Sequence, residues 1–300
     1  MVLPLPERPQ STYRGRFAPS PSGLLHFGSL ISALASYLHA RNRQGKWLVR
    51  IEDIDPPREQ AGASSAILNT LEAFGLHWDE EVLYQSKQTQ VYLDVLDYLK
   101  AQNLSYFCQC TRAEIKAAGG IYPGICKSLD HPKEGSAIRL INSAGHYQYQ
   151  DIFQGTVSCD PALAREDFIL LRKDGLFAYQ LAVVVDDICQ GISHVIRGCD
   201  LLEPTARQLS FYHILGRPAP QYGHVPLAVT NQGYKLSKQN KAPAIDNQKP
   251  QLALVAALNF LGQEPPAELA SCSVEEILTW ATEHWSLDKI PRKQQIILED

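Results

Sequence analysis

A histidine and a glycine stand where the sequence changes from a strand pattern to a helix pattern. His26 follows the stiff turn PSPSG at 19–23, and Gly28 comes two residues later. The N-terminus of a helix binds phosphate because its first N–H groups are unpaired and carry a partial positive charge. A histidine there can donate to a phosphoryl oxygen, and a glycine lets a ligand approach closely. A lone histidine is more often structural, but this setting favours phosphate binding.

A basic motif, KLSKQ at 235–239, follows about two hundred residues later. On its own, this motif would be interpreted as a solvated basic loop. Together with His26 it indicates a second source of positive charge for a nucleotide. A lysine on such a loop can stabilise the negative charge that develops on phosphates during group transfer.

Three cysteines, Cys108, Cys110 and Cys126, lie within nineteen positions of one another. This clustering is typical of a metal site, and its distance from the phosphate motifs favours a structural role. Zinc needs a fourth ligand, for which His131 is the chemically conventional choice. Three reduced thiols without a metal are the alternative. The chain has 7 cysteines, and an odd total argues against a disulfide framework, so the other four are expected to be inert.

The composition is that of an ordinary globular protein. The chain has 300 residues, of which 45% are hydrophobic and 20% charged, and its formal net charge is −4. No apolar run approaches the ~20 residues that span a bilayer, and the N-terminus lacks a signal-peptide core. We therefore expect a cytoplasmic protein. Any basic face for a nucleic acid has to be local.

The pattern of apolar residues predicts a scaffold for the first motif. The expected elements are strands at 13–18 and 47–51, a helix from Phe27 that ends at Gly45, and helices at 58–74 and 87–102. Alternation of strand and helix predicts an α/β protein with a doubly wound parallel sheet.

The second half continues this pattern around an insert. Strands are expected at 177–185 and 224–229, and helices at 204–215, 252–261 and 274–285, whereas 289–300 is expected to be poorly ordered. The predicted organisation is a core in two halves, 11–104 and 161–249, an inserted subdomain with the clustered cysteines at 105–160, and a short helical C-terminal region at 250–300.

The two phosphate motifs resemble the paired signatures of the class I aminoacyl-tRNA synthetases, usually written HIGH and KMSKS. The resemblance implies that family's Rossmann-like core and ATP with Mg²⁺ as co-substrate. It places ATP on His26, Gly28, Ser29, Lys235, Ser237 and Lys238, with His26 and Lys238 as catalytic residues. The chain departs from the pattern at Ser29, where the family often has its second histidine, and at Gln239, which replaces the final serine.

Two further segments, RFAPS at 16–20 and RIEDID at 50–55, resemble the glutamyl-tRNA synthetases. The resemblance implies a glutamate site made of Arg16, Ala18, Ser20, Glu52, Tyr179 and Arg197. The residue types suit this substrate, because arginines bind carboxylates in bidentate fashion and a glutamate can bind an ammonium group. Which arginine meets which carboxylate is left open.

About sixty residues follow Gln239, too few for the anticodon-binding domain of a glutamyl-tRNA synthetase. The chain thus resembles a truncated branch, the glutamyl-queuosine tRNA(Asp) synthetases. That branch activates glutamate without tRNA and transfers it to queuosine at the wobble position of tRNA(Asp). The resemblance implies one structural zinc, held by Cys108, Cys110, Tyr122 and Cys126, so Tyr122 and His131 compete as fourth ligand.

Other expectations concern the RNA and the competing functions. We expect a monomer that holds RNA phosphates through local basic residues, with Lys235, Lys241 and Arg207 as candidates. One alternative is a glutamyl-tRNA synthetase core that charges a tRNA 3′ end. Another is a catalytically silent tRNA-binding paralogue, against which the complete set of motif residues argues.

Overall fold

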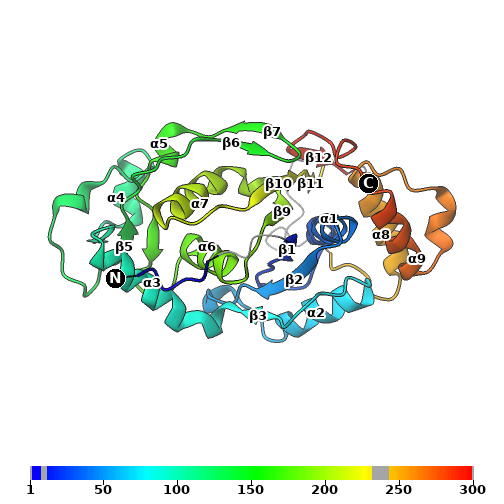
Figure 1. Cartoon of the computed structure of the whole chain (residues 1–300), viewed down its shortest axis with the longest axis horizontal. Helices are drawn as coiled ribbons and strands as arrows, with labels where there is room; N and C mark the ends of the chain where they lie inside the picture. Colours follow the sequence, from blue (N-terminus) through cyan, green and yellow to red (C-terminus); the bar gives the residue numbers. More distant parts are fainter. Residues whose placement is uncertain (1, 8–11, 232–242, 299–300) are drawn as a thin grey trace.

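The computed structural model describes residues 2–7, 12–231 and 243–298, in which strands and helices alternate along the chain (Figure 1). In these residues, no helix is both long enough and apolar enough to cross a membrane. The KLSKQ motif at 235–239 lies outside the described residues.

A mostly parallel sheet forms the centre of the molecule. On one side, β1 (Arg14–Phe17) pairs with β2 (Lys46–Ile51), which pairs with β3 (Leu83–Tyr84). On the other side, β9 (His194–Gly198) lies beside β1 and pairs with β10 (Gln221–Val225). The chain therefore leaves β1 toward one edge of the sheet and β9 toward the opposite edge. In α/β proteins, ligands bind at the carboxyl ends of strands at such a switch point. The predicted α/β fold with a parallel sheet is confirmed.

A hairpin extends this sheet beyond β10. It consists of β6 (Gln148–Asp151) and β7 (Gly155–Ser158), and β6 joins the sheet where Tyr222 of β10 pairs with Asp151. The hairpin lies within the predicted insert at 105–160, yet its hydrogen bonds tie it to the core. The bounds of that insert and of the other three segments remain predictions.

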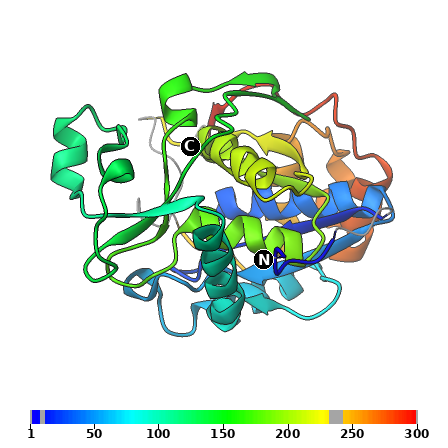
Figure 2. The same cartoon turned by 60° about the vertical axis from the view of Figure 1, so that its left-hand side comes forward.

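The clustered cysteines belong to a smaller lobe built on an antiparallel sheet. This sheet contains β4 (Ser105–Cys108), β5 (Ala137–Leu140) and β8 (Ile169–Leu171). From this sheet, α4 (Arg112–Ala117) and the loop beside it project at one end of the molecule (Figure 2). The sheet itself packs on α6 (Tyr179–Cys189), and the Ala178 N–H donates to the Leu170 carbonyl of β8 at 2.9 Å.

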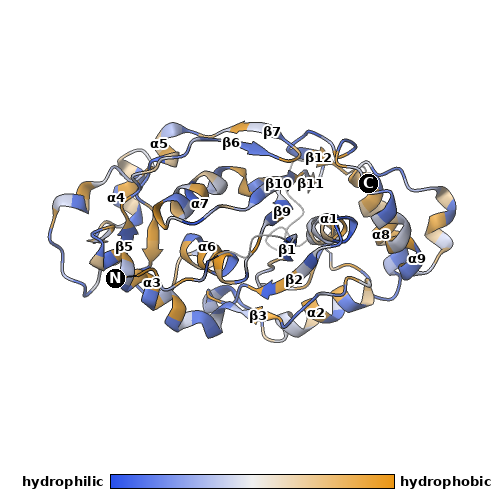
Figure 3. Ribbon diagram, in the orientation of Figure 1, coloured by the Kyte–Doolittle hydropathy of each residue, from blue (hydrophilic) through white to orange (hydrophobic). Residues whose placement is uncertain are grey.

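The larger hydrophobic core is built around α1 (Phe27–Asn42). This helix packs on the central strands and on α8 (Pro250–Phe260) and α9 (Val274–Glu283). On the same face of the sheet, α2 (Ala63–Ala73) adds Ile67 and Leu71 to this core. The apolar faces of these helices turn inward (Figure 3). The predicted helices at both C-terminal positions are confirmed.

A second hydrophobic core contains α3 (Thr89–Ala101), α6 (Tyr179–Cys189) and α7 (Leu202–Ile214). The strand predicted at 177–185 is wrong, because the chain is helical from Tyr179 and residues 179–185 form the first part of α6. Its run of apolar residues is buried on every side, so it lacks the one-sided pattern that distinguishes an amphipathic helix from a buried strand.

Two element boundaries also differ from the sequence prediction. The helix predicted at 58–74 begins only at Ala63, because Pro56–Arg58 forms a separate 3₁₀ turn and Gly62 has a left-handed φ of 77°. The strand predicted at 224–229 is two strands, β10 and β11 (Leu227–Val229), which flank Pro226. Proline cannot donate a ladder hydrogen bond, so the break follows from its chemistry.

The C-terminal segment is better ordered than predicted. β12 (Gln295–Ile297) pairs in parallel with β11. The Leu227 N–H donates to the Gln294 carbonyl at 2.9 Å, and the Leu298 N–H donates to the Val229 carbonyl at 2.9 Å. The expectation of a poorly ordered segment at 289–300 is therefore wrong up to Leu298, because main-chain pairing with a distant strand holds it.

Candidate active site

Four of the predicted glutamate-binding residues meet at the carboxyl ends of the central strands. Arg16 lies in β1, Arg197 lies in β9, Glu52 directly follows β2, and Tyr179 begins α6. The charges of Arg197, Glu52 and Arg16 all act on the Tyr179 phenol, whose pKa is raised chiefly by burial. These residues therefore share one electrostatic environment, although 181 residues separate the first arginine from the last in sequence.

Arg16 is held by a carboxylate from α6. Its Nε and Nη2 donate to Asp187 Oδ1 and Oδ2 at 3.1 and 3.3 Å. Arg50 of β2 donates to the same carboxylate through Nη2 at 2.5 Å. Burial would raise the pKa of Asp187, but the two guanidinium groups lower it below its usual range, so the carboxylate is ionised. One edge of Arg16 is thus occupied, and its Nη1 has no hydrogen-bond acceptor among the described residues.

Arg197 has a different set of partners. Its Nε donates to His224 Nε2 at 3.0 Å, and its Nη2 donates to Thr205 Oγ1 at 2.6 Å and to Gln208 Oε1 at 2.9 Å. Its Nη1 donates to the Tyr179 phenol oxygen at 3.4 Å. The guanidinium group also lies 5.0 Å from the centre of the Tyr222 ring. These contacts fix the side chain and direct Nη1 toward Tyr179.

Glu52 is the carboxyl group of this site that titrates near neutral pH. Its backbone N–H donates to the Pro19 carbonyl at 3.0 Å, which ties the end of β2 to the turn after β1. Burial raises the pKa of its carboxyl to about 7, against the opposing effect of Arg50 and Arg16. A bound ammonium group would favour the charged carboxylate, so ligand binding and proton release are linked at this residue.

His26 caps α1. Its Nδ1 accepts from the Ser29 N–H at 3.3 Å, and its Nε2 lies 3.1 Å from Ser29 Oγ. The backbone of His26 forms a bridge with Ala244, and the Ile245 N–H donates to the Leu25 carbonyl at 3.1 Å. The described chain that follows the KLSKQ motif therefore returns beside His26. The motif residues Lys235, Ser237 and Lys238 themselves lie outside the described residues, as does Lys241.

The remaining predicted residues line the path from β1 to α1. Gly28 and Ser29 belong to the first turn of α1, and both are half-buried. Ala18 is half-buried and Ser20 is exposed in the segment that connects β1 to that helix. All four therefore lie on the same connection as His26.

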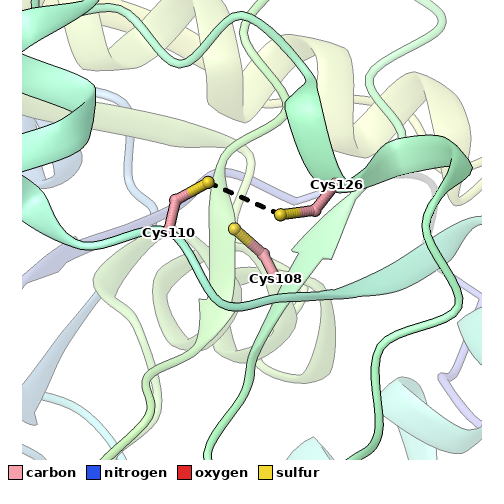
Figure 4. A group of neighbouring side chains, drawn as sticks. All are labelled: Cys108, Cys110 and Cys126. Atoms are coloured by element: carbon pink, nitrogen blue, oxygen red, sulfur yellow. Dashed lines mark hydrogen bonds between the residues drawn. The ribbon is translucent and has the colours of Figure 1, made fainter.

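The three clustered cysteines converge in the smaller lobe (Figure 4). The sulfur atoms of Cys108, Cys110 and Cys126 all lie within 4.8 Å of one another, and Cys110 Sγ is 3.5 Å from Cys126 Sγ. Burial would raise the pKa of the Cys126 thiol, but hydrogen bonds from the Gln109 backbone and neighbouring side chains lower it to about 6. Three sulfur donors in this arrangement are typical of a site for a soft metal ion.

Tyr122 lies at this cluster. Its phenol oxygen accepts from the Cys126 N–H at 2.8 Å, and its ring packs with Cys108 and Cys126 in one buried group. The phenol also interacts with the thiols of Cys108 and Cys126. His131 does not belong to the group of converging ligand atoms. Of the two candidates for a fourth ligand, Tyr122 is therefore the one close to the sulfur atoms.

Sequence analysis missed several residues that support the arginines. They are Arg50, Asp151, Asp187, Gln208 and His224. The pair of aspartates at 186–187 did carry a signal, because carboxylates within an apolar run need buried cations as partners. Gln208 and His224 carried none, since their role depends on contact with Arg197 from another element.

Comparisons with known proteins identify the family of the chain. The family of class I tRNA synthetases (E and Q), catalytic domain, matches residues 12–122 and 125–295. A glutamyl-Q tRNA(Asp) synthetase of Colwellia psychrerythraea is 61% identical over 307 residues, covering 99% of this chain and 98% of that protein. The protein of the same name from Shewanella oneidensis is 56% identical over 290 residues, covering 97% of this chain and 96% of that protein.

A solved structure extends the comparison to the fold. A glutamate tRNA ligase from Elizabethkingia meningosepticum, solved in complex with its amino acid, superposes with a TM-score of 0.78 at 26% identity. The match covers 94% of this chain but 66% of that ligase, so this chain spans about two thirds of its length. The chain therefore belongs to the class I tRNA synthetases of the glutamate and glutamine type, and within them to the glutamyl-Q tRNA(Asp) synthetase family of ligases.

Proposed function

We propose that this protein activates L-glutamate with ATP, without tRNA, and then transfers it to queuosine at the wobble position of tRNA(Asp). The observation that carries the proposal is the pair of buried arginines, Arg16 and Arg197, beside Tyr179 and Glu52 at the switch point of the sheet. Relatives that match nearly the whole chain carry the name of this activity. We further propose that the protein acts as a monomer in the cytoplasm.

The glutamate site needs two cations and one anion. Arg197 directs Nη1 toward Tyr179, and the charge of Arg16 acts on both Tyr179 and Glu52, so each arginine would bind one substrate carboxylate. Glu52 would bind the ammonium group, and Ala18 and Ser20 would line the pocket on the β1 side. Because guanidinium–carboxylate pairs are charge-assisted, such a pocket favours glutamate over its uncharged amide.

The ATP phosphates would lie at the N-terminus of α1, with Gly28 and Ser29 beside them. A carboxylate oxygen of glutamate attacks the α-phosphorus, forming glutamyl-adenylate and releasing pyrophosphate. His26 would donate to the phosphate oxygens, and Lys235, Ser237 and Lys238 would close over them with Mg²⁺ as counter-ion. The return of the chain at Ala244 beside His26 supports this pairing of the two motifs.

In the second step, a hydroxyl of the queuosine diol attacks the activated carbonyl, and AMP leaves. The RNA would be held through phosphate contacts from local basic residues, among them Lys235 and Lys241. Arg207 is a weaker candidate than the sequence suggested, because its guanidinium forms an ion pair with Glu166 and donates to the Leu163 carbonyl.

The cysteine cluster would hold one structural zinc ion. Cys108, Cys110 and Cys126 would bind as thiolates, and Tyr122 would supply the fourth ligand as a phenolate. Zinc would stabilise the lobe by joining the end of β4 to the loop that contains Tyr122 and Cys126.

Substitution of His26 tests the ATP site. We expect His26→Asn to keep an acceptor at the helix N-cap, so stability should change by less than about 1 kcal/mol. Glutamate-dependent pyrophosphate exchange should nevertheless fall by ~10²–10³, since the imidazole N–H is lost and the shorter asparagine amide does not extend to the phosphates. Lys238→Ala should give a similar loss without a change in thermal unfolding. Full exchange activity in either folded variant contradicts the assignment of the motifs.

The pH dependence of glutamate binding tests Glu52. The free carboxyl has a pKa of about 7, so below this pH the ammonium group must displace a proton from it. The KM for glutamate should therefore rise up to about tenfold for each pH unit below 7 and level off above it. We expect Glu52→Gln to raise this KM and to remove its pH dependence. A wild-type KM that is constant from pH 5.5 to 8 argues against the assigned role.

Zinc content tests the cysteine cluster. Purified protein should contain about one zinc per chain, and Cys108→Ser or Cys126→Ser should lower thermal stability before they affect activation. Tyr122→Phe should weaken zinc retention during chelator titration, whereas His131→Ala should not. The opposite pattern would make His131 the fourth ligand.

The identity of the acceptor tests the overall function. An anticodon stem-loop of tRNA(Asp) that carries queuosine should be glutamylated as efficiently as the full-length tRNA. A stem-loop without queuosine should not be glutamylated. Removal of the 3′ CCA end from the full tRNA should leave transfer intact. If the trimmed tRNA is no longer glutamylated while intact tRNA is, the protein charges a 3′ end. If no glutamate-dependent pyrophosphate exchange occurs at all, the protein is a silent paralogue.

A further inference from the structure

Arg197 is a buried cation that has no anionic partner in the described part of the chain. Its residue is 5% exposed, yet no described carboxylate oxygen lies within 4.0 Å of its guanidinium nitrogens. Its acceptors are the His224 imidazole, the Thr205 hydroxyl, the Tyr179 phenol, the Gln208 amide and the Leu201 carbonyl, all of them neutral. Buried charges are usually paired, as Arg16 is with Asp187. Arg16 therefore has a carboxylate partner, whereas Arg197 is held by neutral groups.

The contacts of His224 keep its imidazole neutral. Its Nδ1 lies 2.5 Å from Asp151 Oδ2 and donates to it, so Nε2 has a free lone pair that accepts from Arg197. Asp151 is fixed in turn, because its Oδ1 accepts the backbone N–H groups of Phe153, Gln154 and His224 at 2.9 to 3.1 Å. Asp151 thus sets the tautomer while its negative charge stays one imidazole ring away from Arg197.

Gln208 gives an independent observation. Its Oε1 accepts from Arg197, whereas its buried Nε2 makes no hydrogen bond of good geometry with a described residue, although the amide lies close enough to the Tyr179 phenol to lower its pKa. A glutamate of nearly the same shape would remove this unpaired donor and would form a charged pair with Arg197. Stability of the folded chain alone would therefore favour a carboxylate at this position. The amide is explained if Arg197 has to keep its charge for a ligand.

We infer that His224 and Gln208 are positioning residues that hold Arg197 through neutral acceptors and so keep its full charge for a carboxylate of the substrate. This inference rests on the proposed function, in which Arg197 binds glutamate. A carboxylate in either position would fix the guanidinium equally well, but it would also neutralise it and compete with the substrate. Fixing the Arg197 side chain and preserving its positive charge are therefore two separate requirements.

The experiment compares near-isosteric neutral and charged side chains at the two positions. Gln208→Glu should raise the KM for glutamate by about tenfold or more in pyrophosphate exchange, the size of effect expected when a charge-assisted contact is lost. The KM for ATP should stay within about twofold, and the thermal unfolding temperature should be unchanged or higher. His224→Gln, which keeps a neutral acceptor, should raise the glutamate KM much less than Gln208→Glu does.

An Arg197→Gln background identifies the cause. On its own, Arg197→Gln should raise the glutamate KM strongly, and adding Gln208→Glu should then raise it no further, because the charge to be neutralised is absent. A glutamate KM that Gln208→Glu leaves unchanged, additive effects in the Arg197→Gln background, or a Gln208→Glu variant that does not fold would each overturn the inference. If Arg197→Gln itself leaves the glutamate KM unchanged, the proposed glutamate site fails, and the inference fails with it.

Discussion

The site depends on one buried carboxylate that is shared by two arginines. Asp187 accepts from Arg16 of β1 and from Arg50 of β2, and none of the three side chains is more than 4% exposed. Such a cluster is stable only if every charge has a partner, because an unpaired ion in the interior costs several kcal/mol. The contact therefore docks α6 at the carboxyl ends of the two strands. It also sets the place of Tyr179, which begins the same helix.

The remaining charges of the site follow from this cluster. Glu52 lies next to Arg16 and Arg50, yet burial keeps the pKa of its carboxyl near 7. Arg197 approaches from β9 and meets neutral acceptors instead of a carboxylate. The free site thus holds one compensated arginine, one uncompensated arginine and a carboxyl group poised to titrate. This is the complement of a ligand with two carboxylates and one ammonium group, the chemistry proposed for its substrate.

The hairpin of β6 and β7 links this pocket to the periphery of the sheet. Asp151 lies at the end of β6, where it accepts three backbone N–H groups and orients His224. The Gln154 side chain also donates to the His224 carbonyl at 2.8 Å. Displacement of the hairpin would therefore disturb Arg197 through His224. The cysteine lobe is joined to α7, because the Tyr122 N–H donates to Glu166, which forms an ion pair with Arg207.

The sequence alone determined the α/β fold, the helices of the C-terminal region and the candidate residues on the connection from β1 to α1, because periodic apolar residues and short motifs are local signals. It also assigned Arg16, Glu52, Tyr179 and Arg197 to one site by resemblance. The tertiary structure decided what local signals cannot carry. The segment at 177–185 is a helix because other elements bury it on every side, and the C-terminal strand exists only through pairing with β11. Likewise, Asp187, His224 and Gln208 support the arginines only because distant elements bring these side chains within hydrogen-bond distance. The free energy of such contacts depends on spatial proximity. No stretch of neighbouring residues specifies that proximity.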